Sequence, residues 1–168
     1  MFKKYKEIIY KPLRVLDIFI SLWIIGITVF LICYWKHIPE EVPYHWNAAG
    51  QIDDYSDKGG YIMLIIMMYF LWAWHALSKL IPLFGIKENL FGKNKTIVPR
   101  EVEIRAYNLV FSMLWICDLL TQFMLGYIIL CGMFVKKLGV WFLPLCIVLF
   151  MADFIWFYFT LHKLQKSL

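Results

Sequence analysis

The residues best suited to chemistry lie in one polar segment, residues 38–58, which reads IPEEVPYHWNAAGQIDDYSDK. Five of the twelve acidic residues fall in it, and its candidate functional side chains are His45, Asn47, Asp53, Asp54 and Asp57. Carboxylate and amide oxygens suit a hard cation such as calcium, and a histidine with an aspartate suits general acid/base catalysis. Because long apolar runs flank the segment, we expect function to reside here.

None of these chemistries has its full motif in the segment. It lacks the twelve-residue calcium loop of an EF-hand, and His45 with His37 supplies too few nitrogen or sulfur ligands for zinc. No nucleophile motif accompanies these residues, so a small membrane enzyme is the weakest hypothesis. We predict no metal and no cofactor. We favour a rigid loop that presents Tyr44, Trp46 and Tyr55 to an external partner.

The local pattern predicts how this loop is shaped. Residues 42–47 have a two-residue period, which predicts one short extended stretch. Its aromatic side, Tyr44 and Trp46, would then pack on the membrane or on the helices, with His45 and Asn47 facing the other way.

Turn and cap residues follow this stretch. Pro43 biases the residue before it toward an extended conformation. Asn47 to Gln51 carries a turn in which Gly50 can adopt a positive φ. Ser56 or Asp57 can then cap the next helix, where the helix dipole favours a negative charge.

The composition around the segment is that of a membrane protein. The 168 residues are 62% hydrophobic, 19% aromatic and 17% charged, whereas soluble domains are about half apolar and about a quarter charged. The net charge of +5 comes from bases that cluster at the ends of apolar runs, so we predict no nucleic-acid binding.

Four apolar runs reach the length of about 20 residues that a membrane-spanning helix needs. They cover approximately residues 13–35, 61–84, 104–135 and 138–161. We therefore predict an all-α integral membrane fold, an antiparallel four-helix bundle that forms a single transmembrane domain over residues 1–168. Segment 38–58 is then a structured extracytoplasmic loop between the first two helices.

The basic residues predict the orientation of the bundle. Thirteen of the seventeen lie before the first helix, between the second and third, or after the fourth, on one side of the membrane. Cytoplasmic loops carry the excess of Lys and Arg. We therefore expect a multi-pass protein of the cytoplasmic (inner) membrane with both termini in the cytoplasm.

A few polar residues interrupt the apolar runs, and each is a candidate functional group. His75 and Asp153 are predicted at equal depth, so they could pair, and Asp118 shares one helical face with Gln122. These groups could fix the register of the bundle or relay protons or ions, and we favour the structural role. The cysteines carry no redox or zinc pattern and are expected to be small apolar residues: Cys33, Cys117, Cys131 and Cys146.

The polar segment resembles the loop motif of a widespread bacterial four-helix membrane domain of unknown biochemical activity. That motif fixes prolines, a histidine, an aromatic residue, an asparagine, a glycine, an aspartate, a tyrosine and a lysine at set spacings. The matching positions are Ile38, Pro39, Val42, Pro43, His45, Trp46, Asn47, Gly50, Asp53, Tyr55 and Lys58. The best-known proteins with this domain are the SdpI-like immunity proteins, whose second polar motif has no counterpart here.

The resemblance implies a non-enzymatic bacterial protein of immunity or sensing. Its partners would be membrane lipids, a peptide toxin or another membrane protein bound through loop 38–58, and a cytoplasmic regulator at loop 85–103. The alternative is an accessory subunit of a larger membrane complex or transporter.

Overall fold

A computed structural model describes residues 13–78 and 98–166. Four helices dominate it: α2 (Leu13–Tyr34), α3 (Gly60–Ser78), α5 (Arg100–Met133) and α6 (Phe142–Lys166). All four are long and apolar enough to cross a membrane. The prediction of four such helices in a multi-pass membrane protein is therefore confirmed.

The helix boundaries differ most from the predicted ones at the start of α5 and at both ends of α6, which extends to Lys166 and not to 161. Helix α5 begins at Arg100, directly after Pro99, whereas the sequence predicted a start at residue 104. Helix α6 begins at Phe142 and not at 138, because Val135 and Gly139 adopt φ values of 51° and 88° that interrupt a helix. A linker of residues 134–141 results. The predicted residues 79–84 of the second helix lie outside the described part.

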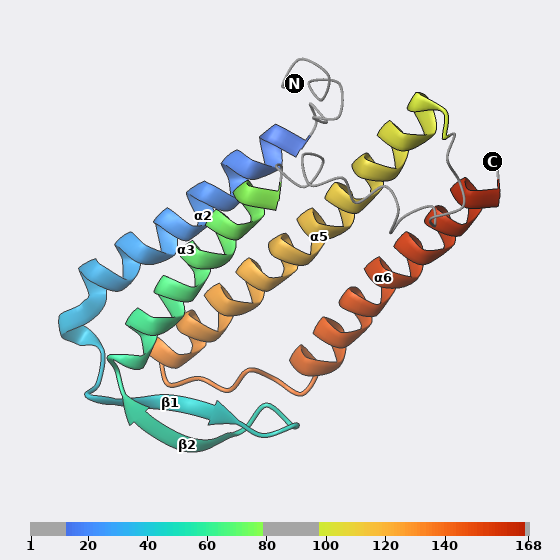
Figure 1. The fold of residues 1–168 in the computed structure, drawn as a ribbon. Coiled ribbons are helices and arrows are strands. Elements are labelled where there is room, and N and C mark those ends of the chain that lie inside the picture. Colours follow the sequence, from blue (N-terminus) through green and yellow to red (C-terminus); the bar gives the residue numbers. More distant parts are fainter. Residues whose placement is uncertain (1–12, 79–97, 167–168) are drawn as a thin grey trace.

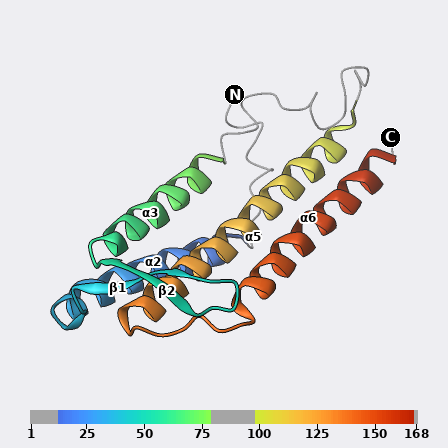
Figure 2. The same cartoon turned by 90° about the horizontal axis from the view of Figure 1, so that it is seen from below.

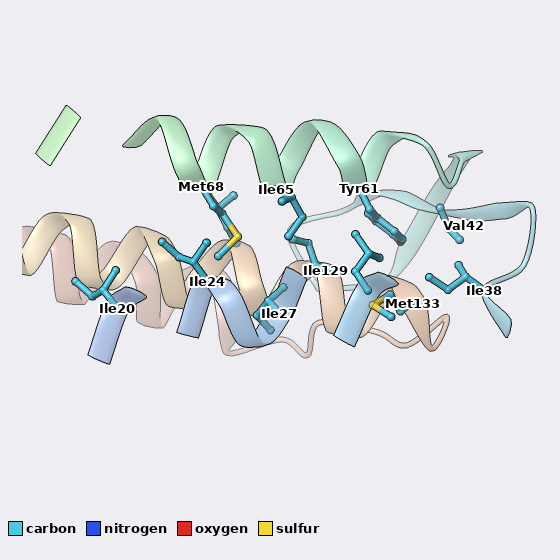
Figure 3. Close-up of a cluster of buried hydrophobic side chains, with 12 residues drawn as sticks. Ile20, Ile24, Ile27, Ile38, Val42, Tyr61, Ile65, Met68, Ile129 and Met133 are labelled. Carbon is cyan, nitrogen blue, oxygen red and sulfur yellow. The ribbon is translucent and has the colours of Figure 1, made fainter. Parts of the chain in front are cut away.

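Helices α2, α3 and α5 contact one another, and α6 packs against α5 (Figures 1 and 2). Helices α2 and α5 run toward the β-strands and α3 and α6 run back, as the colours in Figure 1 show. Buried apolar side chains recur every three to four residues along α2, which places them on one face. The cluster that they form with α3 and α5 is drawn in Figure 3 and includes Ile20, Ile24, Ile27, Ile65, Met68 and Ile129.

The loop between α2 and α3 is a β-hairpin, which the all-α prediction missed. A short 3-10 helix, η1 (Trp35–His37), leads to strands β1 (Glu41–Trp46) and β2 (Ile52–Asp57). The strands pair in antiparallel register, with Glu41 opposite Asp57 and Trp46 opposite Ile52. One extended stretch was predicted, and the structure has two.

The predicted alternation along β1 is wrong. Val42 and the next residue, Pro43, are both buried, and Tyr44 and His45 are both exposed. The register shifts between Pro43 and His45, and again between His45 and Trp46. Such irregularities break the two-residue period of side chains. Tyr44 therefore points away from the protein and does not pack on it.

A buried hydrogen bond ties the hairpin to the helices. The Tyr61 hydroxyl, in the first turn of α3, donates to the Pro43 carbonyl oxygen at 3.0 Å. Gly132, near the end of α5, lies against the Tyr61 ring so closely that a methyl group there would overlap the hydroxyl. The contact thus joins β1, α3 and α5, and Figure 3 shows Tyr61 between the helices and the hairpin.

This contact predicts that Gly132→Ala destabilises the protein. Because the added methyl group must displace Tyr61 from Pro43, we expect a loss of about 1–3 kcal/mol in the free energy of unfolding. Unfolding by denaturant in detergent micelles measures it. Gly26→Ala is the matched control, since a Cβ there would meet nothing within 4 Å. Equal effects of the two substitutions would contradict this account of the contact.

Candidate functional site

Asn47 organises the tip of the hairpin. Its side-chain oxygen Oδ1 accepts hydrogen bonds from the backbone N–H groups of Ala49 at 3.0 Å and Gln51 at 3.1 Å. The backbone N–H of Asn47 donates to the Gln51 carbonyl, and that of Gly50 to the Asn47 carbonyl. Gly50 has a φ of 70°, the left-handed conformation that the sequence predicted. Asn47 and Gly50 are therefore structural.

The polar side chains predicted as a cluster are only partly brought together. His45 Nδ1 lies 2.6 Å from Asp53 Oδ1, and both side chains are exposed. Asp54 instead accepts the backbone N–H of Tyr55, and Asp57 accepts that of Gly59 at 2.6 Å, just before α3. The contact of Asp57 fits the predicted role at the start of this helix. Of the predicted cluster, the exposed His45–Asp53 pair is therefore the part that could still take part in acid/base chemistry.

Lys58 closes the base of the hairpin. Its Nζ lies 2.8 Å from Glu40 Oε1, reaches the Ile38 carbonyl oxygen at 3.5 Å and sits 5.3 Å from the centre of the Trp35 ring. The Lys58 backbone N–H also donates to the Glu40 carbonyl. A lysine can meet all of these partners because its ammonium has three donors at the end of a flexible stem.

The linker between α5 and α6 holds the far end of the hairpin, which sequence reasoning missed. The Leu138 N–H donates to the Gly50 carbonyl at 3.0 Å, and the Trp46 indole donates to the Lys136 carbonyl at 3.1 Å. Tyr127 of α5 donates to the Leu138 carbonyl. The sequence signals that the fourth helix starts late were Gly139 in the linker and Pro144, since proline is tolerated in the first turn of a helix but not in its interior. Trp46 is thus a structural contact.

The exposed side chains define what the hairpin presents. Tyr44 and Tyr55 are 67% and 50% exposed, and the His45 side chain is 62% exposed. We call these three residues the recognition surface. Among residues 13–78 and 98–166, no group of three or more His, Cys, Asp or Glu side chains could hold a metal ion.

The polar residues in the helices pair differently from the prediction. His75 of α3 has its Nε2 3.5 Å from Asp17 Oδ1 of α2, and the Trp115 indole also donates to that oxygen at 3.1 Å. Asp153 accepts a hydrogen bond from the Cys117 thiol at 3.2 Å. The suggested pair of His75 with Asp153 is therefore wrong, because α6 packs against α5.

Gln122 joins three helices. Its side-chain nitrogen donates to Asp118 Oδ1 at 3.1 Å, as expected for residues that share one helical face, and to the Met68 carbonyl of α3 at 3.0 Å. The Trp23 indole of α2 donates to the Gln122 carbonyl. These contacts support the structural role predicted for Gln122. The suggested regulator loop, residues 85–103, lies mostly outside the described part, which resumes at residue 98.

The hairpin tip offers a paired test of its contact with the linker. A Cβ on Gly50 would lie 2.5 Å from the Gly139 carbonyl oxygen, whereas one on Gly139 would meet nothing within 4 Å. Both glycines have a positive φ, so an alanine at either position strains the backbone and destabilises the protein by about 1–2 kcal/mol. We expect Gly50→Ala to lower the thermal unfolding temperature further than Gly139→Ala. The same shift in both variants would mean that the linker does not hold the tip.

One region of the chain matches a known protein family. Residues 22–69 match the model of a family described as Domain of unknown function (DUF1648). The match runs from the middle of α2 through the hairpin into α3, so it contains the whole loop motif of residues 38–58. No curated protein and no solved structure matches the chain. A stretch of this chain that includes the recognition surface is therefore similar to a domain whose function is unknown.

Proposed function

We propose that this chain is a non-enzymatic protein of the bacterial cytoplasmic membrane that binds a peptide through the hairpin of residues 38–58, and so serves immunity or sensing. Its helices form an antiparallel bundle with both termini in the cytoplasm. The observation that carries the proposal is the recognition surface, whose Tyr44, His45 and Tyr55 side chains are exposed on a hairpin fixed at both ends.

The distribution of charge supports an outward-facing hairpin. Arg100 and Arg105 open α5, and Lys163 and Lys166 close α6. Figure 1 shows both of these helix ends opposite the hairpin. Because Lys and Arg concentrate in cytoplasmic segments, this arrangement favours a hairpin on the outer side.

An ordered hairpin with exposed tyrosines is better suited to binding than to catalysis. Tyrosine provides a large contact area with few rotatable bonds, so little conformational entropy is lost when a partner binds. A loop that is already ordered also avoids the entropy cost of folding on contact. Asn47, Lys58 and Trp46 supply this order, and the side chains of the recognition surface remain exposed.

Photo-crosslinking tests the recognition surface directly. A photoreactive amino acid at Tyr44 is expected to capture the peptide in cells exposed to it, because that ring is exposed on the hairpin. Tyr158 is the control position, since it is also exposed, at 63%, but lies toward the other end of the molecule on α6. Equal capture at both positions would show that the hairpin is not the binding surface.

The biological role is tested by deleting the gene and challenging the cells with a panel of antimicrobial peptides. We expect lower survival or a lost transcriptional response, restored by the wild-type chain but not by a Tyr44→Ala, Tyr55→Ala double variant of equal abundance. Unchanged survival and transcription across the panel would count against immunity and sensing.

One observation favours a second function, that of a subunit in a larger membrane complex. Asp153 is the one buried residue of α6, and the helix packs mainly against α5, with Ile147 and Val148 among its exposed side chains. A partner helix could cover this surface. A photoreactive amino acid at Val148 is then expected to capture a membrane protein in native membranes. Capture of lipid alone would assign this face to the bilayer.

A further inference from the structure

One turn of α5 meets an ionisable side chain from each of the other three helices. Trp115 donates to Asp17 of α2 and packs edge-on against His75 of α3, with ring centres 5.6 Å apart. Two residues later, Cys117 donates to Asp153 of α6. Asp118 itself belongs to the same turn. The described titratable groups that meet here therefore come from all four helices.

All of these groups except Asp17 are buried, and among the side chains that the structure describes here negative groups outnumber positive ones. His75, Asp118 and Asp153 are at most 8% exposed, and the Asp17 side chain is 26% exposed. Three carboxyl groups therefore accompany a single imidazole in this part of the chain. An ionised carboxylate inside a bilayer costs several kcal/mol unless a cation or a hydrogen-bond donor compensates it. Even a charged imidazole would balance only one of the two buried carboxyl groups, Asp118 and Asp153.

Several buried oxygens have no hydrogen-bond partner within residues 13–78 and 98–166. They are Asp118 Oδ2, Gln122 Oε1 and Asp153 Oδ1, together with Asn108 Oδ1, which lies nearer the start of α5. Asp118 and Gln122 are joined through the other atoms of their side chains, so their unpartnered oxygens come from adjacent groups. Buried polar atoms are almost always paired, and an exception calls for an explanation such as a bound ion.

A cavity adjoins the side chain of Asp118. It has a volume of about 180 Å³ and lies between α3 and α5, and its polar lining comes from His75, Cys117, Asp118 and Thr121. The rest of its wall is apolar, from residues such as Leu71 and Leu114. A volume of this size holds more than one water-sized particle, so it can admit a small ion with part of its hydration.

We propose that Asp118 is the centre of an intramembrane binding site for a small monovalent cation, either a proton or Na⁺. Asp118 Oδ2 and Gln122 Oε1 supply the oxygen atoms that a hard cation prefers, and the same carboxylate can instead take up a proton. The other titratable groups of the cavity wall are His75 and Cys117, and behind them lie Asp17, which contacts His75, and Asp153, which contacts Cys117. The site is separate from peptide binding at the hairpin, and neither depends on the other.

Cation binding to the folded protein alone raises its unfolding temperature, and this is the basis of the test. The full chain in lipid nanodiscs is melted over a range of pH, and over a ~hundredfold range of NaCl with choline chloride keeping the ionic strength constant. A sodium site predicts a rise of several degrees with Na⁺. A proton site predicts a rise as the pH falls, with no response to Na⁺.

Asp118→Asn is expected to abolish whichever response the wild type shows, because the amide binds neither cation as a carboxylate does. Asp54→Asn, in the exposed hairpin, is the matched control and should keep the full response. An Asp118→Asn variant with the same dependence on pH and Na⁺ as the wild type would overturn the proposal.

Infrared spectroscopy of the wild type keeps the proposal falsifiable if Asp118→Asn does not fold. With isotope-labelled aspartate, a bound proton gives the C=O stretch of a neutral carboxylic acid, and bound Na⁺ shifts the carboxylate bands when choline is exchanged for Na⁺. A spectrum with neither signal at any pH at which the protein is folded would equally overturn it.

Discussion

The hydrogen bond from the Tyr61 hydroxyl to the Pro43 carbonyl fixes the relation between the two parts of this protein. Pro43 belongs to the hairpin and Tyr61 to the start of α3, and the absence of a side chain at Gly132 makes room for the ring. A buried carbonyl without a partner costs about 1–3 kcal/mol, so the bond strongly favours one position of β1 on the helices. The remaining hairpin contacts, at Lys58 and at Gly50, build on that position.

A small number of polar contacts also positions the helices relative to one another. Lipid tails are as apolar as the helix surfaces, so hydrophobic burial does little to hold membrane helices together. Interhelical hydrogen bonds supply much of the specificity, and Gln122 provides it by joining α5 to α3 while its carbonyl accepts from α2. Helix α6 is joined to α5 by the hydrogen bond from Cys117 to Asp153, and Asp153 is its one buried residue. It is therefore the helix most open to a partner.

Much of the helical framework could be predicted from sequence because membrane insertion depends on local hydropathy. The turn at Gly50 and the role of Asp57 could also be predicted, because both depend on neighbours only a few residues away in the sequence. Strand β2 could not be predicted from the sequence, because its residues IDDYSD are rich in aspartate and lack the apolar alternation of a half-buried strand. Its strand conformation comes from pairing with β1.

The predictions that failed at the site did so because the sequence does not show contacts between segments that are distant along the chain. The irregular register near His45 exposes Tyr44, although the two-residue period predicted that it would pack. Trp46 was predicted either to present its ring to a partner or to pack on the membrane or the helices, and its contact with the linker of residues 134–141 was not foreseen. Likewise, equal depth suggested His75 with Asp153, but neighbouring helices and not depth alone decide which groups meet.

The central claim is that the hairpin is an ordered element held by the helices and not a mobile loop. Hydrogen–deuterium exchange of the full chain in nanodiscs tests it most directly, at the backbone N–H groups of Asn47, Lys58 and Leu138, which donate to Gln51, Glu40 and Gly50. The account predicts slow exchange at all three positions, far slower than in an unstructured peptide of the same sequence. Exchange at the rate of that peptide would contradict it.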